Sequence, residues 1–276
     1  MFNFAENLKK MDKILFATDF SNNALNALDY AVELANFFES QLVMIHAVDV
    51  PSKAGTLHIL ERQMTQDAEK ELANWIARAK VKLNNPEALK AKIVKGDALK
   101  RIETVAEQFD INLVVVSAKG QGDDEDKYLG RVSAGIVKKT DIPVLIVPIT
   151  YRFKPVKSIV FSIKFKRVSS PKVVEPLKQI AKKFNSSVSV LHVKTPDFDA
   201  SRDENMYLDD LPHKLYNLEG NFIFNTTQAF IEDHPIDLLV AIRRKRGFFK
   251  NMIFNNGTKK KTFNSEVPFL VLKGKK

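Results

Sequence analysis

The chain has no cysteine among its 276 residues, which excludes disulfide bonds and thiol chemistry and fits a reducing compartment. It also has no uninterrupted apolar run of about 18 residues, so no segment is expected to cross a membrane. The first ten residues do not have the basic-then-apolar order of a secretory signal. With 45% hydrophobic residues the chain is expected to be globular, and we predict a cytoplasmic location.

Four segments of the first half of the chain return in the second half in the same order. The matching pairs are residues 13–20 with 157–165, 41–48 with 187–193, 111–116 with 236–241, and 142–147 with 267–272. This preserved order indicates a tandem duplication of a whole domain rather than a short solenoid repeat. Two domains of ordinary size fit the chain length, and we expect them at residues 10–150 and 151–276, with a linker at 151–155.

Short apolar runs alternate with amphipathic stretches along the first copy. The runs predict strands at residues 14–17, 42–48, 89–94, 113–116 and 143–147, and the stretches predict helices at 24–35, 57–83, 98–109 and 132–139. Ser21 is the predicted N-cap of the first helix. Strands that alternate with helices form parallel sheets through crossover connections. The predicted fold class is therefore α/β, with two tandem doubly wound, five-stranded, Rossmann-like parallel sheets.

The second copy is shorter, and the loss lies between its second and fourth strands. His46 precedes Ile111 by 65 residues, whereas His192 precedes Ile236 by 44. A polar, acidic stretch at residues 196–212 replaces the long helix of the first copy and is expected to form a loop or a short helix. Part of one sheet face should then be less covered in the second copy.

The loops after the first and fourth strands of the first copy should meet in space. In an open parallel sheet, ligands bind at the carboxyl ends of the strands where the strand order reverses. Residues 18–21 follow the first strand, and the fourth strand is followed by a loop with three glycines that ends at a helix. Backbone N–H groups made accessible by glycine, together with a helix N-terminus, form an anion site.

At these loops the chain resembles a tandem universal stress protein of the UspA family. The resemblance is carried by residues 16–21, the strand at 45–48, Gly96-Asp97, and the spacing Ser117-x2-Gly120-x9-Gly130 ahead of the strand at 143–147. It covers nearly the whole chain, strongly in the first copy and weakly in the second. It implies a stress-response protein whose fold is related to the adenine nucleotide alpha hydrolases.

One branch of this family binds ATP through a loop of the pattern Gly-x2-Gly-x9-Gly-Ser/Thr. The resemblance therefore implies a site in the first copy for ATP or another adenine nucleotide, with or without Mg²⁺. Asp19 would meet the ribose, and Ala17, Thr18 and Ala47 would line the adenine pocket. The phosphates would lie against the second loop, at Ser117, Gly120, Gly130, Arg131 and Val132.

Two positions depart from the family pattern. Ser117 stands where the first glycine is expected, and Arg131 stands where the pattern has Ser or Thr. Arg131 either donates a charged fork to a phosphate or fills the pocket. The four carboxylates of residues 123–126 either repel a triphosphate, point outward or bind a divalent cation. The alternative function is a protein-interaction module that binds no nucleotide, with unknown partners.

The second copy lacks the acid expected at the ribose, because Lys164 stands at the position of Asp19. The first 150 residues carry a net charge of −2 and the rest carry +12. Arg243, Arg244 and Arg246 follow the fourth strand of this copy and form a candidate anion site. We expect no ATP site of the family type here. A solvated surface is the favoured interpretation of the basic charge, so nucleic acid is not the expected partner. Binding of an anion or RNA through this half is the third interpretation.

No cluster of residues suggests catalysis. The five histidines have no metal-ligand or triad spacing, and the matched positions of His46 and His192 favour a structural role. We therefore expect no enzyme activity beyond slow ATP hydrolysis and no resident metal. Single-domain relatives dimerise through their last strands, so residues 143–147 and 268–272 are expected to pair within the chain as an intramolecular pseudo-dimer. The sequence does not decide whether the whole chain also forms a homodimer.

Overall fold

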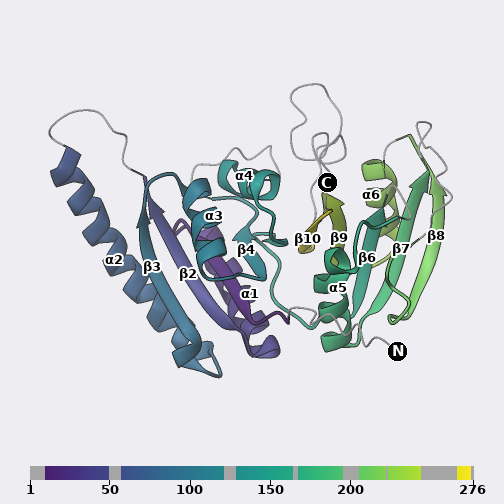
Figure 1. The fold of residues 1–276 in the computed structure, drawn as a ribbon, viewed down its shortest axis with the longest axis horizontal. Helices are drawn as coiled ribbons and strands as arrows, with labels where there is room; N and C mark the ends of the chain where they lie inside the picture. Colours follow the sequence, from purple (N-terminus) through teal and green to yellow (C-terminus); the bar gives the residue numbers. More distant parts are fainter. Residues whose placement is uncertain are drawn as a thin grey trace, which may run out of the picture. The chain divides into compact units, whose positions relative to one another are not determined.

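The computed structural model describes residues 10–49, 57–120, 129–163, 167–194, 205–221, 223–243 and 266–274. The chain divides into two compact units, and the boundary between them lies between Phe153 and Lys154. Each unit contains its own run of strands and helices (Figure 1). No helix within the described ranges is both long and apolar enough to span a membrane.

The first unit is a five-stranded parallel sheet covered by helices. Its strands are β1 (Lys13–Thr18), β2 (Gln41–Val48), β3 (Leu89–Lys95), β4 (Leu113–Ser117) and β5 (Val144–Val147), in the spatial order β3-β2-β1-β4-β5. Its helices are α1 (Asn22–Phe38), α2 (Leu57–Lys82), α3 (Ala98–Gln108) and α4 (Arg131–Lys139), with a short 3-10 turn η1 at Pro86–Ala88. The strand order reverses between β1 and β4, which confirms the predicted α/β, doubly wound fold.

Local sequence explains where α1 begins and what it buries. The Ser21 side chain accepts a hydrogen bond from the Ala24 N–H at 3.2 Å, so Ser21 is the N-cap that was predicted. Leu28 and Val32 are fully buried against the sheet. Burial of each such side chain contributes about 1.5–3 kcal/mol, more than the helix propensity of any single residue. The helix is therefore held mainly by its apolar face.

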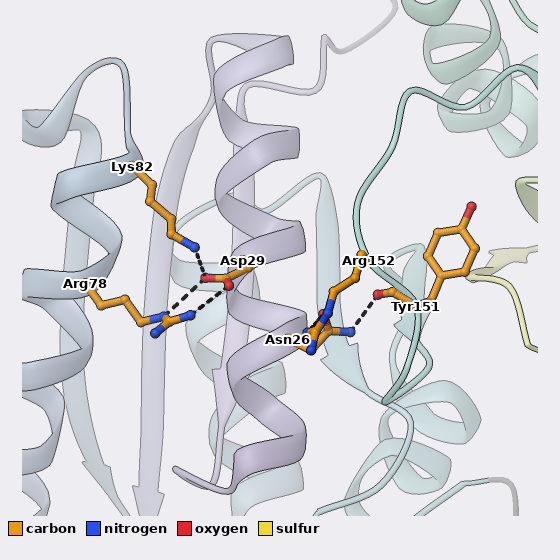
Figure 2. Close-up of polar contacts among 6 residues, drawn as sticks. All are labelled: Asn26, Asp29, Arg78, Lys82, Tyr151 and Arg152. Carbon is orange, nitrogen blue, oxygen red and sulfur yellow. Dashed lines mark hydrogen bonds and ion pairs between the residues drawn. The ribbon is translucent and has the colours of Figure 1, made fainter.

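Polar contacts on α1 fasten two neighbouring segments to it (Figure 2). Asp29 binds Arg78 Nη2 at 2.8 Å and Lys82 Nζ at 2.9 Å, both from the last turns of α2. Asn26 donates to the backbone oxygens of Pro148 at 3.0 Å and Tyr151 at 2.7 Å. The buried side of α1 thus packs on the sheet, while Asp29 ties α1 to α2 and Asn26 ties it to the segment after β5.

The second unit repeats the sheet, and its described residues contain fewer helices than the first unit. Its strands are β6 (Ser158–Ile163), β7 (Ser187–Lys194), β8 (His213–Glu219), β9 (Leu238–Arg243) and β10 (Phe269–Lys273), in the order β10-β9-β6-β7-β8, and neighbours within the unit are parallel. Its described helices are α5 (Pro171–Phe184) and α6 (Ile223–Asp233). Residues 205–212 contain no helix, as expected for the acidic stretch; its earlier residues lie outside the described ranges.

Among the described residues, outer strand β8 of the second unit is more exposed than outer strand β3 of the first. In the first unit α2 packs along β2 and β3 (Figure 1), where Leu89 is buried. The matching strand of the second unit is β8, in which Leu215 is 40% exposed. This agrees with the less covered face expected from the missing residues. The expected pairing of residues 143–147 with 268–272 concerns one unit against the other and stays a prediction.

Candidate functional site

A pocket of about 320 Å³ lies at the carboxyl ends of β1, β2 and β4 in the first unit. Eight of the nine predicted site residues line it, namely Ala17, Thr18, Asp19, Ala47, Ser117, Gly120, Arg131 and Val132. Gly130 is not among the lining residues. It is the buried N-cap of α4, and its N–H donates to the Ala118 oxygen at 2.8 Å. Gly130 therefore shapes the loop rather than facing the cavity.

The loop after β1 is held in a fixed form by its own side chains. The Thr18 hydroxyl accepts a hydrogen bond from the Phe20 N–H at 2.9 Å, and the Asp19 carboxylate accepts one from the Ser21 N–H at 3.0 Å. Phe20 has φ 61°, a left-handed conformation that costs energy for any residue with a side chain. Its ring stacks on His46 with centroids 4.1 Å apart and makes a T-shaped contact with Trp75 with centroids 5.5 Å apart. These aromatic contacts offset the backbone cost.

His46 also lines the pocket, although the sequence suggested only a structural role. Its Nδ1 lies 2.9 Å from the Thr18 backbone oxygen, and because a carbonyl only accepts, the ring donates there. Burial lowers the pKa of His46, and this outweighs the hydrogen bond to Thr18 and the charge of Asp19, which both raise it. The ring is therefore neutral at pH 7, with Nε2 as a hydrogen-bond acceptor. Its place near the carboxyl end of β2 is the sequence signal that could have indicated it.

The loop after β4 is closed at its base by three hydrogen bonds. The Ser117 hydroxyl donates to the Lys119 oxygen at 2.8 Å, and the Ser133 hydroxyl donates to the Ser117 oxygen at 2.7 Å. The Gly130–Ala118 bond completes the closure. The hydroxyl of Ser117 is thus engaged within its own loop. The acidic residues 123–126 lie outside the described residues, so their expected effect on a phosphate stays a prediction.

The pocket combines an apolar wall with charged groups. The wall includes Ile45, Leu99, Ile102, Val116 and Ile136. The charged groups include three carboxylates and two cations. Three of them were not predicted as site residues from the sequence, namely Asp49, Asp97 and Lys119. Such a cavity suits a flat apolar ring with a polar, charged extension. Within the described ranges no group of three or more histidine, aspartate or glutamate side chains is placed to hold a metal ion.

The candidate anion site of the second unit is described only in part. Arg243 ends β9, and burial lowers the pKa of its guanidinium, which still stays charged at neutral pH. Arg244, Arg246 and Lys164 lie outside the described residues, so this site stays a prediction. His192 is only 1% exposed, and its Nδ1 lies 3.1 Å from Asn217 Oδ1, which agrees with a structural role.

The model of the universal stress protein family matches residues 10–148. The chain belongs to the universal stress protein family. Among curated members, it is 26% identical over 151 residues to universal stress protein MJ0577 of Methanocaldococcus jannaschii, an alignment that covers 49% of this chain and 93% of the relative. It is 27% identical to universal stress protein YxiE of Bacillus subtilis, over 49% of this chain and 98% of the relative. Each relative therefore corresponds to about half of this chain.

A solved structure extends the likeness beyond one unit. The crystal structure of a universal stress protein from Archaeoglobus fulgidus matches 96% of this chain and 97% of its own chain, with a TM-score of 0.71 and 19% identity. Because the sequence identity is only 19%, this likeness shows that the two proteins share a fold and no more. Together with the family match, it confirms the tandem universal stress protein that the sequence resembled.

Proposed function

We propose that the first unit of this universal stress protein binds ATP or another adenine nucleotide in the pocket at the ends of β1 and β4. The second unit serves as a degenerate copy without such a site, in a cytoplasmic stress-response protein with no catalysis beyond slow ATP hydrolysis. The observation that carries the proposal is the convergence of eight implied site residues on one cavity. Residues as distant in sequence as Ala17 and Val132 meet there.

The cavity provides groups suited to each part of a nucleotide. The apolar wall would hold the adenine ring, and the carboxylate of Asp19 would accept hydrogen bonds from ribose hydroxyls. Gly120, Arg131 and the first turn of α4 would hold the phosphates, since a helix N-terminus and a guanidinium both favour anions. Because Ser117 is bonded within its loop, its hydroxyl need not block the phosphates.

Because the cavity is lined by both acidic and basic side chains, we expect Mg²⁺ to strengthen the binding of ATP. Lys119 and Arg131 attract phosphate, whereas Asp49 and Asp97 repel it. At about 8 Å and an effective dielectric constant of about 20, each charge changes the interaction by about 2 kcal/mol, and less where solvent screens it. The opposing charges leave little net attraction for a bare triphosphate. A metal ion that arrives with the phosphates would reduce the repulsion.

The direct test is to purify the full chain, release any bound small molecule and identify it by mass spectrometry. Fluorescence titration with ATP, ADP and AMP, with and without Mg²⁺, then uses Trp75, the single tryptophan of the chain, which lies 5.5 Å from the Phe20 ring. We expect Asp19→Asn to weaken binding about tenfold, as for loss of one charge-assisted hydrogen bond. Asp67→Asn, on the exposed surface of α2, is the control.

Two results would oppose the proposal. One is that no adenine nucleotide binds to the folded chain, which would favour the alternative of an interaction module without nucleotide. The other is that Asp19→Asn binds as tightly as Asp67→Asn, which would place any bound nucleotide elsewhere on the molecule. Circular dichroism of each variant establishes that the fold is intact.

A further inference from the structure

Ser162 of β6 holds the position in the second unit that Ala17 of β1 holds in the first. Phe16 and Phe161, the residues that precede them, have equivalent partners on the fourth strand of their unit. Ala17 is partly exposed and lines the cavity of the first unit. Ser162 is larger by a hydroxyl group and is only 3% exposed. Of these two equivalent positions, one is therefore open and the other is buried.

A second position of the cavity wall differs in the same way. Ala47 follows His46 in β2 and Val193 follows His192 in β7, and the two histidines have equivalent partners on the first strand of their unit. Ala47 is partly exposed and lines the cavity. Val193 has a larger side chain and is 0% exposed. The larger side chain is therefore buried where the first unit is open.

A hydrogen bond joins Ser162 to the helix that packs on β6. Thr227 is the fifth residue of α6, as Ile102, which lines the cavity, is the fifth residue of α3. The Oγ atom of Ser162 lies 2.7 Å from Thr227 Oγ1, and both side chains are buried. The Thr227 hydroxyl gives its one hydrogen to the Ile223 oxygen at 2.8 Å, so Ser162 is the donor to Thr227. Strand and helix are thus joined at the positions that line the cavity in the first unit.

We infer that the second unit is closed to ligands where the first is proposed to hold the base, and that Ser162, Val193 and Thr227 determine that one unit alone binds nucleotide. The identity of this place as the base site rests on the proposed function, but the closure itself does not. The replacement of Asp19 by Lys164 is then not what excludes a nucleotide from the second unit.

Opening of this place is unfavourable for two reasons. A ring between β6 and α6 would break the bond from Ser162 and leave a buried donor without an acceptor. It would also have to displace Val193, and extra volume in a filled interior forces side chains and backbone to shift. The contacts of the helices agree, since α6 packs against β6 and β7, whereas α3 packs chiefly against β2 and α4.

Restoring the acid alone separates closure from charge. Lys164→Asp supplies a carboxylate at the position equivalent to Asp19. If the missing acid were the reason for the single site, calorimetry would then find two nucleotides per chain. We expect one, as in the unmodified chain, and a second site in this variant would overturn the inference.

Transfer of the larger side chain to the first unit is the converse test. Ala47→Val should weaken nucleotide binding about tenfold or more, because it fills space that the ring needs. Ala73→Val, on the exposed surface of α2, is the matched control. Equal affinities of the two variants would contradict the closing role of a valine at this position.

The bond from Ser162 to Thr227 predicts unequal effects of two single variants on the urea midpoint. Thr227→Val leaves the Ser162 donor without an acceptor, whereas Ser162→Ala leaves Thr227 bonded to Ile223. Thr227→Val should therefore lower the midpoint more, and the double variant should recover part of that loss. A double variant no more stable than Thr227→Val would contradict the bond.

The most direct test of the closure uses the absence of cysteine from the chain. Ala17→Cys and Ser162→Cys place one thiol at equivalent positions, and methyl methanethiosulfonate is a small, uncharged reagent for both. We expect Ala17→Cys to react about 100-fold faster or more, because a buried thiol reacts only when the fold opens. Both thiols should react at the same rate in urea. Equal rates in the folded chains would overturn the inference.

The pair Ala47→Cys and Val193→Cys repeats the comparison at the second position, with circular dichroism to establish the fold of each variant. A Val193→Cys thiol as reactive as that of Ala47→Cys would also overturn the closure. These rates are measured without nucleotide, so the two failures are distinct. Failure of the proposed function appears as no nucleotide bound to the unmodified chain, whereas failure of the closure appears as equal labelling rates.

Discussion

Asn112 and Asp237 make the same contact in the two units. Asn112 Oδ1 accepts hydrogen bonds from the backbone N–H groups of Asp12 and Lys13 at 3.0 and 2.9 Å, at the start of β1. Asp237 Oδ2 accepts them from Lys157 and Ser158 at 2.8 and 3.0 Å, at the start of β6. The amide of Asn112 in the first unit and the carboxylate of Asp237 in the second therefore hold the first and fourth strands of their unit in register.

The contact predicts how Asp237 variants behave. Asp237→Ala leaves two backbone N–H groups without their partner and should lower the free energy of unfolding by about 1–3 kcal/mol. Asp237→Asn should cost less, because Asn112 makes the same two bonds in the first unit. Urea unfolding followed by circular dichroism measures both. Equal losses for the two variants would show that the charge of Asp237, and not its bonds to the backbone, stabilises this site.

Asp237 also predicts a pH dependence. Burial alone would raise its pKa, but the hydrogen bonds from Lys154, Lys157 and Ser158 outweigh burial and hold the pKa below its ordinary value of 3.8. The stabilisation is therefore complete above about pH 4 and is lost as the pH falls through the lower folded pKa. Asp237→Asn should flatten the acid limb of the stability curve. An unchanged acid limb in that variant would contradict the lowered pKa.

Asp210 should contribute a second acid-sensitive contact. It binds Lys178 Nζ at 2.6 Å and also pairs with Lys182, and the hydrogen bonds of these two lysines lower its pKa to about 2. Its stabilising effect should be lost between about pH 4 and pH 2. At neutral pH, Asp210→Asn should cost about 1 kcal/mol, because solvent screens a half-exposed carboxylate. The neighbouring exposed Asp209→Asn is the control, and an equal loss there would contradict the assignment.

Both units have an acid that pairs with two cations, but the charges are reversed on the matching helices α1 and α5. In the first unit the acid Asp29 lies on α1 and binds Arg78 and Lys82 of α2 (Figure 2), whereas in the second the lysines lie on α5 and the acid is Asp210. We expect Asp29→Asn to lower the free energy of unfolding by up to about 1 kcal/mol at low salt and less at high salt. Trp75 fluorescence reports unfolding of α2. A loss unaffected by salt would contradict an ionic role.

His46 lines the pocket, and its protonation should depend on the neighbouring Asp19. Because burial lowers its pKa, NMR should show the ring titrating below pH 6.5, and stability should decline as the pH falls below that value. The charge of Asp19 raises the pKa of His46, so Asp19→Asn should move the midpoint lower still. A midpoint that rises in this variant would contradict the contact between the two groups.

The sequence predicted the elements of the first unit to within one or two residues at most boundaries, because its buried parallel strands are continuous apolar runs. It did not locate β8, since His213–Glu219 is exposed and has no continuous apolar run. Gly130 matched the expected spacing yet does not line the pocket. Spacing alone does not show which way a backbone faces.

Contacts between distant residues account for what the sequence could not supply. The left-handed φ of Phe20 follows from its packing on His46 and Trp75, which come from two other elements. Asn26 is buried and polar within a helix, and only the fold shows that it binds backbone oxygens more than 120 residues later in the chain. Such contacts depend on the tertiary structure and leave no local pattern.

The most direct measurement is isothermal titration calorimetry of the full chain with ATP and Mg²⁺, beside Asp19→Asn and Asp67→Asn. The central claim is that only the first unit binds nucleotide. It predicts one nucleotide per chain for the unmodified protein and for Asp67→Asn, and much weaker binding for Asp19→Asn. Two nucleotides per chain, or none with the fold intact, would contradict it.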